Sequence, residues 1–90
     1  MKKAVQVQEV DGEGLVGLIE QHVMVFCLSY IYAGILEGVN DDCILLREAE
    51  IVYETGPFDK KGYETAQALP GGKWYIQKTA IESYGLGKAK

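Results

Sequence analysis

The segment over residues 23–28 constrains the fold most, because it is apolar on both faces of an extended strand. One face carries Val23, Val25 and Cys27, and the other carries Met24, Phe26 and Leu28. Such a strand is either buried on both faces, or buried on one face and covered by a neighbouring subunit on the other. The chain has only 90 residues, and a domain of this size buries a limited share of its surface. Oligomerisation is therefore one way to cover this strand.

The remaining pattern predicts one short helix followed by five strands. The helix is expected over residues 13–21, with Asp11 as its N-cap, and its glycines weaken it. The strands are expected over residues 23–28, 30–38, 43–53, 73–77 and 79–84. Gly34 and Gly38 indicate sharp bending of the second strand, and the residues after it have the composition of a turn. This pattern predicts a mostly β, strongly bent five-stranded barrel.

Residues 1–90 are expected to form a single domain with three irregular segments. Residues 1–12 are predicted to be an N-terminal arm, in which residues 4–10 alternate as in a short strand or an extended arm. Residues 56–72 contain two prolines and four glycines and are predicted to be a variable loop. Within them, residues 63–69 fit either a helical turn or another strand. Residues 85–90 are predicted to be a flexible tail.

The charges are distributed unevenly along the chain. Residues 4–59 contain eleven acidic residues and one basic residue, whereas residues 60–90 contain six lysines and two glutamates. A generic nucleic-acid-binding protein usually carries a basic surplus, so a nucleic-acid site in this chain would have to be local. The longest apolar stretch is too short to span a membrane, and the N-terminus does not resemble a signal peptide. We therefore expect a cytoplasmic protein without a membrane partner.

The residues that commonly carry catalysis or bind metal are sparse. Cys27 and Cys43 are expected to be reduced core residues, and His22 has no second histidine with which to form a metal site. No nucleophile is paired with a base, and Gly71-Gly72-Lys73 lacks the rest of a phosphate-binding loop. We expect neither an enzyme nor a cofactor or metal site.

Residues 34–49 resemble the first signature of the Sm-like family, which includes the LSm and Hfq-like proteins. That signature combines a glycine and an aliphatic residue, a turn, and an apolar strand that ends near an acidic residue and an alanine. The matching residues are Gly34, Leu36, Val39, Asn40, Ile44, Leu46, Glu48 and Ala49. Residues 76–83 are similar to the second signature in its Hfq-like form, and the resemblance spans residues 14–84.

The resemblance implies an Sm-like fold, which is an SH3-like open antiparallel barrel of five strands headed by a short helix. It also implies a closed homo-oligomeric ring of about five to seven subunits, in which the fourth strand of one subunit pairs with the fifth strand of the next. A short chain with exposed strand edges agrees with this assembly. The expected seam residues are Trp74, Tyr75 and Ile76 on one strand and Ile81 and Tyr84 on the other.

The resemblance further implies single-stranded RNA as a partner, bound by two turns around the central pore. The first turn corresponds to Asn40, Asp41, Asp42 and Cys43, and the second to Gln77, Lys78 and Thr79. This chain retains the lysine, but the stacking aromatic of Hfq-like proteins falls on Asp42 and their histidine falls on Thr79.

These departures leave alternatives open. Asn40, Asp41 and Asp42 also fit a simple hairpin turn, and Lys78 also fits a solvated turn residue. Tyr30 and Tyr32 fit packing or interface residues as well as a platform for bases. The rival function is a ring that acts as a protein-interaction or structural scaffold and has lost RNA binding.

Overall fold

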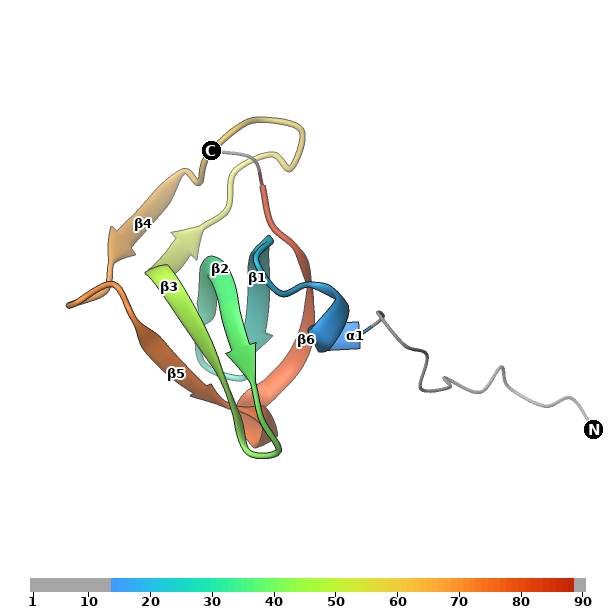
Figure 1. Ribbon diagram of the computed structural model, residues 1–90. Helices are drawn as coiled ribbons and strands as arrows, with labels where there is room; N and C mark the ends of the chain where they lie inside the picture. The colour runs from blue at the N-terminus through green and yellow to red at the C-terminus, as the bar shows by residue number, and fades with distance from the viewer. Residues whose placement is uncertain (1–13, 89–90) are drawn as a thin grey trace, which may run out of the picture.

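The structure, a computed structural model, describes residues 14–88. They form one short helix and an open antiparallel sheet of six strands (Figure 1). The elements are α1 (Gly14–Gly17), β1 (His22–Cys27), β2 (Ile31–Val39), β3 (Cys43–Glu54), β4 (Thr65–Ala68), β5 (Trp74–Gln77), the 3₁₀ helix η1 (Lys78–Ala80) and β6 (Ile81–Leu86). The expected mostly β class is confirmed, whereas the expected number of five strands is corrected to six. The predicted arm at residues 1–12 lies outside the described residues.

The sheet curls around the long strand β3. The strand order is β4-β3-β2-β1-β6, and β5 pairs with β3 beside β4. The strand β6 returns to pair with β1, and η1 alone joins β5 to β6 (Figure 1). Among the described residues, β4, β5 and β6 each pair with a single strand, so each presents a free edge.

The sixth strand arises because the partner of β3 is split in two. The first half of β3 pairs with β5 and the second half pairs with β4, while residues 47–49 face residues 69–73. The backbone φ of Glu48 is 51°, and those of Gly71 and Gly72 are both 75°. Glycine adopts such angles without steric cost, which permits a wide bulge here. The predicted loop over residues 56–72 therefore contains a strand, one of the two alternatives for residues 63–69.

The strand β2 passes very close to this bend at Gly34. A Cβ atom on Gly34 would lie 2.9 Å from the carbonyl oxygen of Arg47 and 3.1 Å from Cα of Ala49. The register between β2 and β3 is irregular beside both Gly34 and Gly38, where the sequence predicts bending. Only glycine fits at position 34 without displacing backbone atoms.

The core lies inside the curl of the sheet. Its buried side chains are Val23, Val25, Leu36, Ile44, Leu46, Ala49 and Ile76. On the other face of β1, Met24 is also buried, whereas Leu28 in the following turn is 83% exposed. The described residues of a single chain thus cover much of both faces of β1. Both cysteines are free and half-buried.

The helix is shorter than predicted, with four residues instead of the nine over positions 13–21. Two glycines lie within it, and glycine is a poor helix former. The chain then turns at Glu20, whose φ is 71° and whose amide donates a 2.7 Å hydrogen bond to the carbonyl of Leu36. This tertiary bond replaces the helical one. No helix in the described part of the chain is long and apolar enough to cross a membrane.

The C-terminal segment is more ordered than the predicted tail over residues 85–90. The strand β6 continues to Leu86, and the amide of Gly87 donates to the carbonyl of His22. Lys88 is buried: its ammonium donates a 2.6 Å hydrogen bond to the carbonyl of Thr55 and lies 5.6 Å from the ring centre of Tyr63. A buried ammonium needs such partners, and the segment after β3 supplies them.

Candidate functional site

The two turns predicted to bind RNA lie side by side. The amide of Lys78 donates a 2.8 Å hydrogen bond to the carbonyl of Asp42, and Cys43 pairs with Gln77 in the sheet. Together they border a surface hollow of about 530 Å³, which is lined by Asp41, Asp42, Cys43, Tyr75, Gln77, Lys78 and Thr79. Sequence segments more than thirty residues apart are thus joined at one end of the sheet.

Asn40 shapes the first turn rather than the hollow. Its side-chain oxygen accepts hydrogen bonds of 2.7 and 2.8 Å from the amides of Asp42 and Cys43. This is an Asx-turn, in which the side-chain oxygen of asparagine takes the place of a backbone carbonyl as hydrogen-bond acceptor. The turn alone explains why asparagine occupies position 40, and no ligand needs to be invoked. These two hydrogen bonds account for the side-chain oxygen of Asn40, as expected if Asn40 is a hairpin-turn residue.

The charge of the hollow is mixed. Asp41 and Asp42 are exposed, and Lys78 is half-buried beside them. Two carboxylates thus accompany one ammonium, which weakens the attraction for a polyanion. Tyr75, which is 67% exposed, supplies an aromatic ring at the same hollow.

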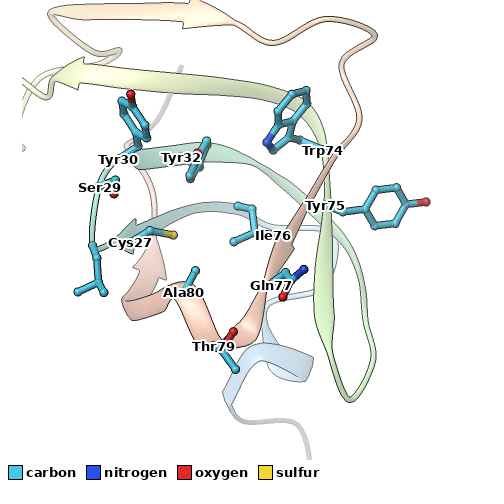
Figure 2. A pocket seen from close by; sticks show the side chains of 11 residues that line it. Cys27, Ser29, Tyr30, Tyr32, Trp74, Tyr75, Ile76, Gln77, Thr79 and Ala80 are labelled. Atoms are coloured by element: carbon cyan, nitrogen blue, oxygen red, sulfur yellow. The ribbon is translucent and has the colours of Figure 1, made fainter.

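A second, more aromatic groove lies between the β1–β2 turn and β5 (Figure 2). It has a volume of about 560 Å³, with Tyr30, Tyr32 and Trp74 as aromatic walls. The rings of Tyr30 and Tyr32 have centres 6.4 Å apart and planes inclined at 62°. Cys27 and Tyr32 are half-buried in this region, and their burial raises the pKa of the Cys27 thiol and of the Tyr32 hydroxyl.

The sequence offers Tyr30, Tyr32 and Trp74 as aromatic residues on which bases could stack, but it does not place them in one groove. The spacing of Tyr30 and Tyr32 was a usable signal, because residues two apart point to the same face of a strand. Trp74 joins them only through the curl of the sheet, which no local pattern indicates.

The predicted seam residues differ in their exposure. Tyr75 and Tyr84 are 67% and 41% exposed, and Leu86, which was not predicted, is 66% exposed. Ile76 is buried in the core, and Trp74 and Ile81 are half-buried against it. The side chain of Ile76 is therefore packed within the core of its own chain, while the outer backbone edge of β5 is unpaired in the described structure.

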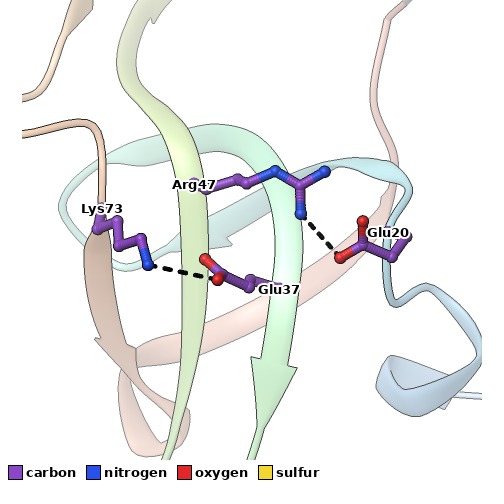
Figure 3. Close-up of polar contacts among 4 residues, drawn as sticks. All are labelled: Glu20, Glu37, Arg47 and Lys73. Carbon is purple, nitrogen blue, oxygen red and sulfur yellow. Dashed lines mark hydrogen bonds and ion pairs between the residues drawn. The ribbon is translucent and has the colours of Figure 1, made fainter.

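Two ion pairs lie near the middle of the sheet, and one of them joins β3 to the segment after α1 (Figure 3). Arg47 donates a 2.7 Å hydrogen bond to Glu20, and Lys73 lies 3.4 Å from Glu37. The hydrogen bond from Arg47 holds the pKa of Glu20 below its ordinary value. Both basic groups have acidic partners, and ion pairs as exposed as these contribute little to stability.

Within residues 14–88, no three His, Cys, Asp or Glu side chains lie close enough together to hold a metal ion. The fold and the two hollows define a small, mostly β protein with a curled antiparallel sheet, free strand edges and clustered aromatic side chains. No protein-family model matches the chain, and no curated protein matches it significantly.

Proposed function

We propose that this protein is an Sm-like, SH3-like open barrel that assembles into a closed homo-oligomeric ring and binds single-stranded RNA without catalysis. The order of elements supports the fold: a short helix precedes three paired strands, the split partner of β3 follows, and the last strand returns to β1. The resemblance of residues 34–49 and 76–83 to the Sm-like signatures supports the same assignment.

The free edges of β5 and β6 are the observation that carries the proposal. Unpaired edges expose backbone donors and acceptors that favour pairing with another chain. The free edge of β6 is flanked by the exposed side chains of Tyr84 and Leu86. Pairing of β5 in one subunit with β6 in the next is a head-to-tail contact, which closes into a ring when the rotation between subunits permits it.

The paired turns support RNA as the ligand. Lys78 can meet a phosphate, Gln77 and Thr79 supply polar groups for a base edge, and Tyr75 offers a stacking face at the same hollow. Tyr75 therefore provides the aromatic surface that is absent at position 42. Repetition around a ring would multiply each of these contacts.

The second candidate function is a protein-interaction or structural ring without RNA binding. The carboxylates of Asp41 and Asp42 favour it, because they border the same hollow as Lys78 and repel phosphate. The two functions share the ring and differ only in what the hollow binds.

Light scattering combined with size-exclusion chromatography tests the ring, and fluorescence anisotropy with labelled oligo-U and oligo-A tests RNA binding. We expect an oligomer at micromolar concentration, and an affinity for RNA that falls as salt rises. Lys78→Ala should weaken binding and reduce the salt dependence, whereas Lys61→Ala is the matched control outside the hollow. Asp41→Asn should tighten binding.

Three outcomes distinguish the proposals. An oligomer that binds RNA through Lys78 supports the first function. An oligomer that binds neither oligonucleotide at low salt refutes RNA binding and favours the scaffold. A stable monomer at micromolar concentration refutes both.

A further inference from the structure

The groove of Tyr30, Tyr32 and Trp74 has the shape of a corner rather than a flat platform (Figure 2). The planes of the two tyrosine rings are inclined at 62°, and Trp74 lines the same groove, with Tyr32 between it and Tyr30. Between these walls lie Cys27, Ile76 and Ala80, which form an apolar floor. The angle between the tyrosine planes suits a compact, rounded group better than a flat ring, because a flat ring stacks on a single face.

The faces of aromatic rings attract cations, most strongly for tryptophan. The protein has a net charge of −4, which favours a cationic ligand over an anionic one. Among the described residues that line the groove there is no lysine or arginine. A phosphate-bearing ligand would therefore find no counter-charge in this part of the structure.

The polar lining also discriminates between cations. The lining side chains in the described structure include no carboxylate, and the polar ones are neutral, such as Ser29, Gln77 and Thr79. A primary ammonium would lose hydrogen bonds to water without a charged acceptor to replace them. A trimethylammonium group has no N–H to satisfy, and its methyl groups can pack on the apolar floor.

We propose that this groove binds a trimethylammonium group carried on an alkyl chain without phosphate, such as the side chain of trimethyllysine. The occupant is a cation held by π faces, so the inference goes beyond the proposed RNA site and does not depend on the ring. The paired turns and this groove are lined mostly by different side chains, and Tyr75 and the residues at positions 77 and 79 border both.

Trp74 is the only tryptophan of the chain, so its fluorescence reports directly on the groove. Titrations of the full-length protein would use trimethyllysine and choline, with 3,3-dimethyl-1-butanol as the neutral isostere of choline and lysine as the unmethylated cation. We expect a saturable change with trimethyllysine and choline, and binding at least about tenfold weaker for both comparison compounds. Phosphocholine should bind more weakly than choline.

Variants connect this signal to the aromatic walls. Tyr32→Ala should weaken binding of trimethyllysine about tenfold, and Trp74→Ala should weaken it at least as much. Because Trp74→Ala removes the fluorescent group, its binding is measured by NMR of the ligand methyl groups. Tyr53→Ala is the control outside the groove, and Tyr53 is 53% exposed, close to the 51% of Tyr30 in the groove wall. Circular dichroism would establish that each variant is folded, and Trp74→Phe gives a second, milder change at the same wall.

Several results would overturn the proposal. Equal binding of choline and its neutral isostere would show that the positive charge contributes nothing and that the groove binds apolar groups without specificity. Tighter binding of phosphocholine would assign the group to a lipid headgroup instead of a methylated side chain. An equal loss in Tyr53→Ala, or no saturable binding of either trimethylammonium compound, would exclude the site.

Discussion

Replacing Gly34 with alanine tests the close approach of β2 to the bend of β3. The added methyl group would lie 2.9 Å from the carbonyl oxygen of Arg47, 3.1 Å from Cα of Ala49 and 3.3 Å from Cβ of Leu46. Carbon atoms in contact prefer separations of about 3.5–4.0 Å. Two of the three neighbours are backbone atoms, so no side-chain rotation relieves the overlap.

The strand β2 also cannot simply move away from β3, because it is held on its other side. Gly34 is paired with Val23 of β1, and that strand belongs to the core. We therefore expect the cost of overpacking a closely packed interior, about 1–3 kcal/mol of unfolding free energy. A domain of this size has a total stability of about 5–15 kcal/mol, so the change is large.

Urea unfolding followed by circular dichroism measures this loss, and a thermal scan should show a midpoint lower by roughly 8–16 °C for a loss of about 2 kcal/mol. Gly38→Ala is the matched control on the same strand, because no described atom lies within 4 Å of its Cβ position. It should remain within about 0.5 kcal/mol of the parent or become slightly more stable. Equal effects of the two substitutions would refute the close approach at position 34.

Three further predictions concern polar contacts. Asn40→Ala should cost about 1 kcal/mol, because two backbone amides of its turn lose their acceptor, and Asn40→Asp should retain most of the stability in urea unfolding. The pKa of Glu20 is lowered by Arg47, so the stabilisation from this pair is present above the ordinary glutamate pKa and is lost as pH falls through the lowered value. NMR titration should show the pKa rising towards its ordinary value in Arg47→Gln, and an unchanged value would contradict this. Lys88→Ala should lower the free energy of unfolding by about 1–3 kcal/mol, because the carbonyl of Thr55 loses its donor. Hydrogen exchange of the backbone amides that follow Thr55 should become faster, and unchanged exchange would argue against a buried lysine.

The three long strands were predictable because their signals are local. Alternating apolar residues and the turn residue Asn40 indicate β1, β2 and β3, and the observed bounds differ from the expected ones by at most one residue. The glycines of β2 also indicated where the sheet bends. In these segments the local pattern and the tertiary structure favour the same conformation.

The elements that differed depend on distant partners. The helix ends early because the amide of Glu20 bonds to Leu36. The strand expected over residues 73–77 is present as β5, but the bend of β3 at Glu48 leaves the second half of β3 to pair with the additional strand β4. Lys88 has the sequence signature of a solvated tail, yet it is buried because Thr55 and Tyr63 lie beside it. None of these contacts has a local sequence signature.

The candidate site shows the same division. The two turns were recognisable from their composition and from the family resemblance, but their meeting depends on the pairing of Cys43 with Gln77. The aromatic groove combines residues of β2 and β5 that are more than forty positions apart. Only the curl of the sheet brings Trp74 to the same groove as Tyr32.

The short link η1 connects the hollow of the two turns to the strands β5 and β6, so a change in the conformation of η1 affects all three. Lys78 borders the hollow and is also the first of the three residues that join β5 to β6. If copies of the chain assemble through β5 and β6 as proposed, a molecule that favours one conformation of η1 would change the angle at which they meet. Because such coupling is reciprocal, self-association would then change the affinity for that molecule by the same factor by which the molecule changes the affinity between copies.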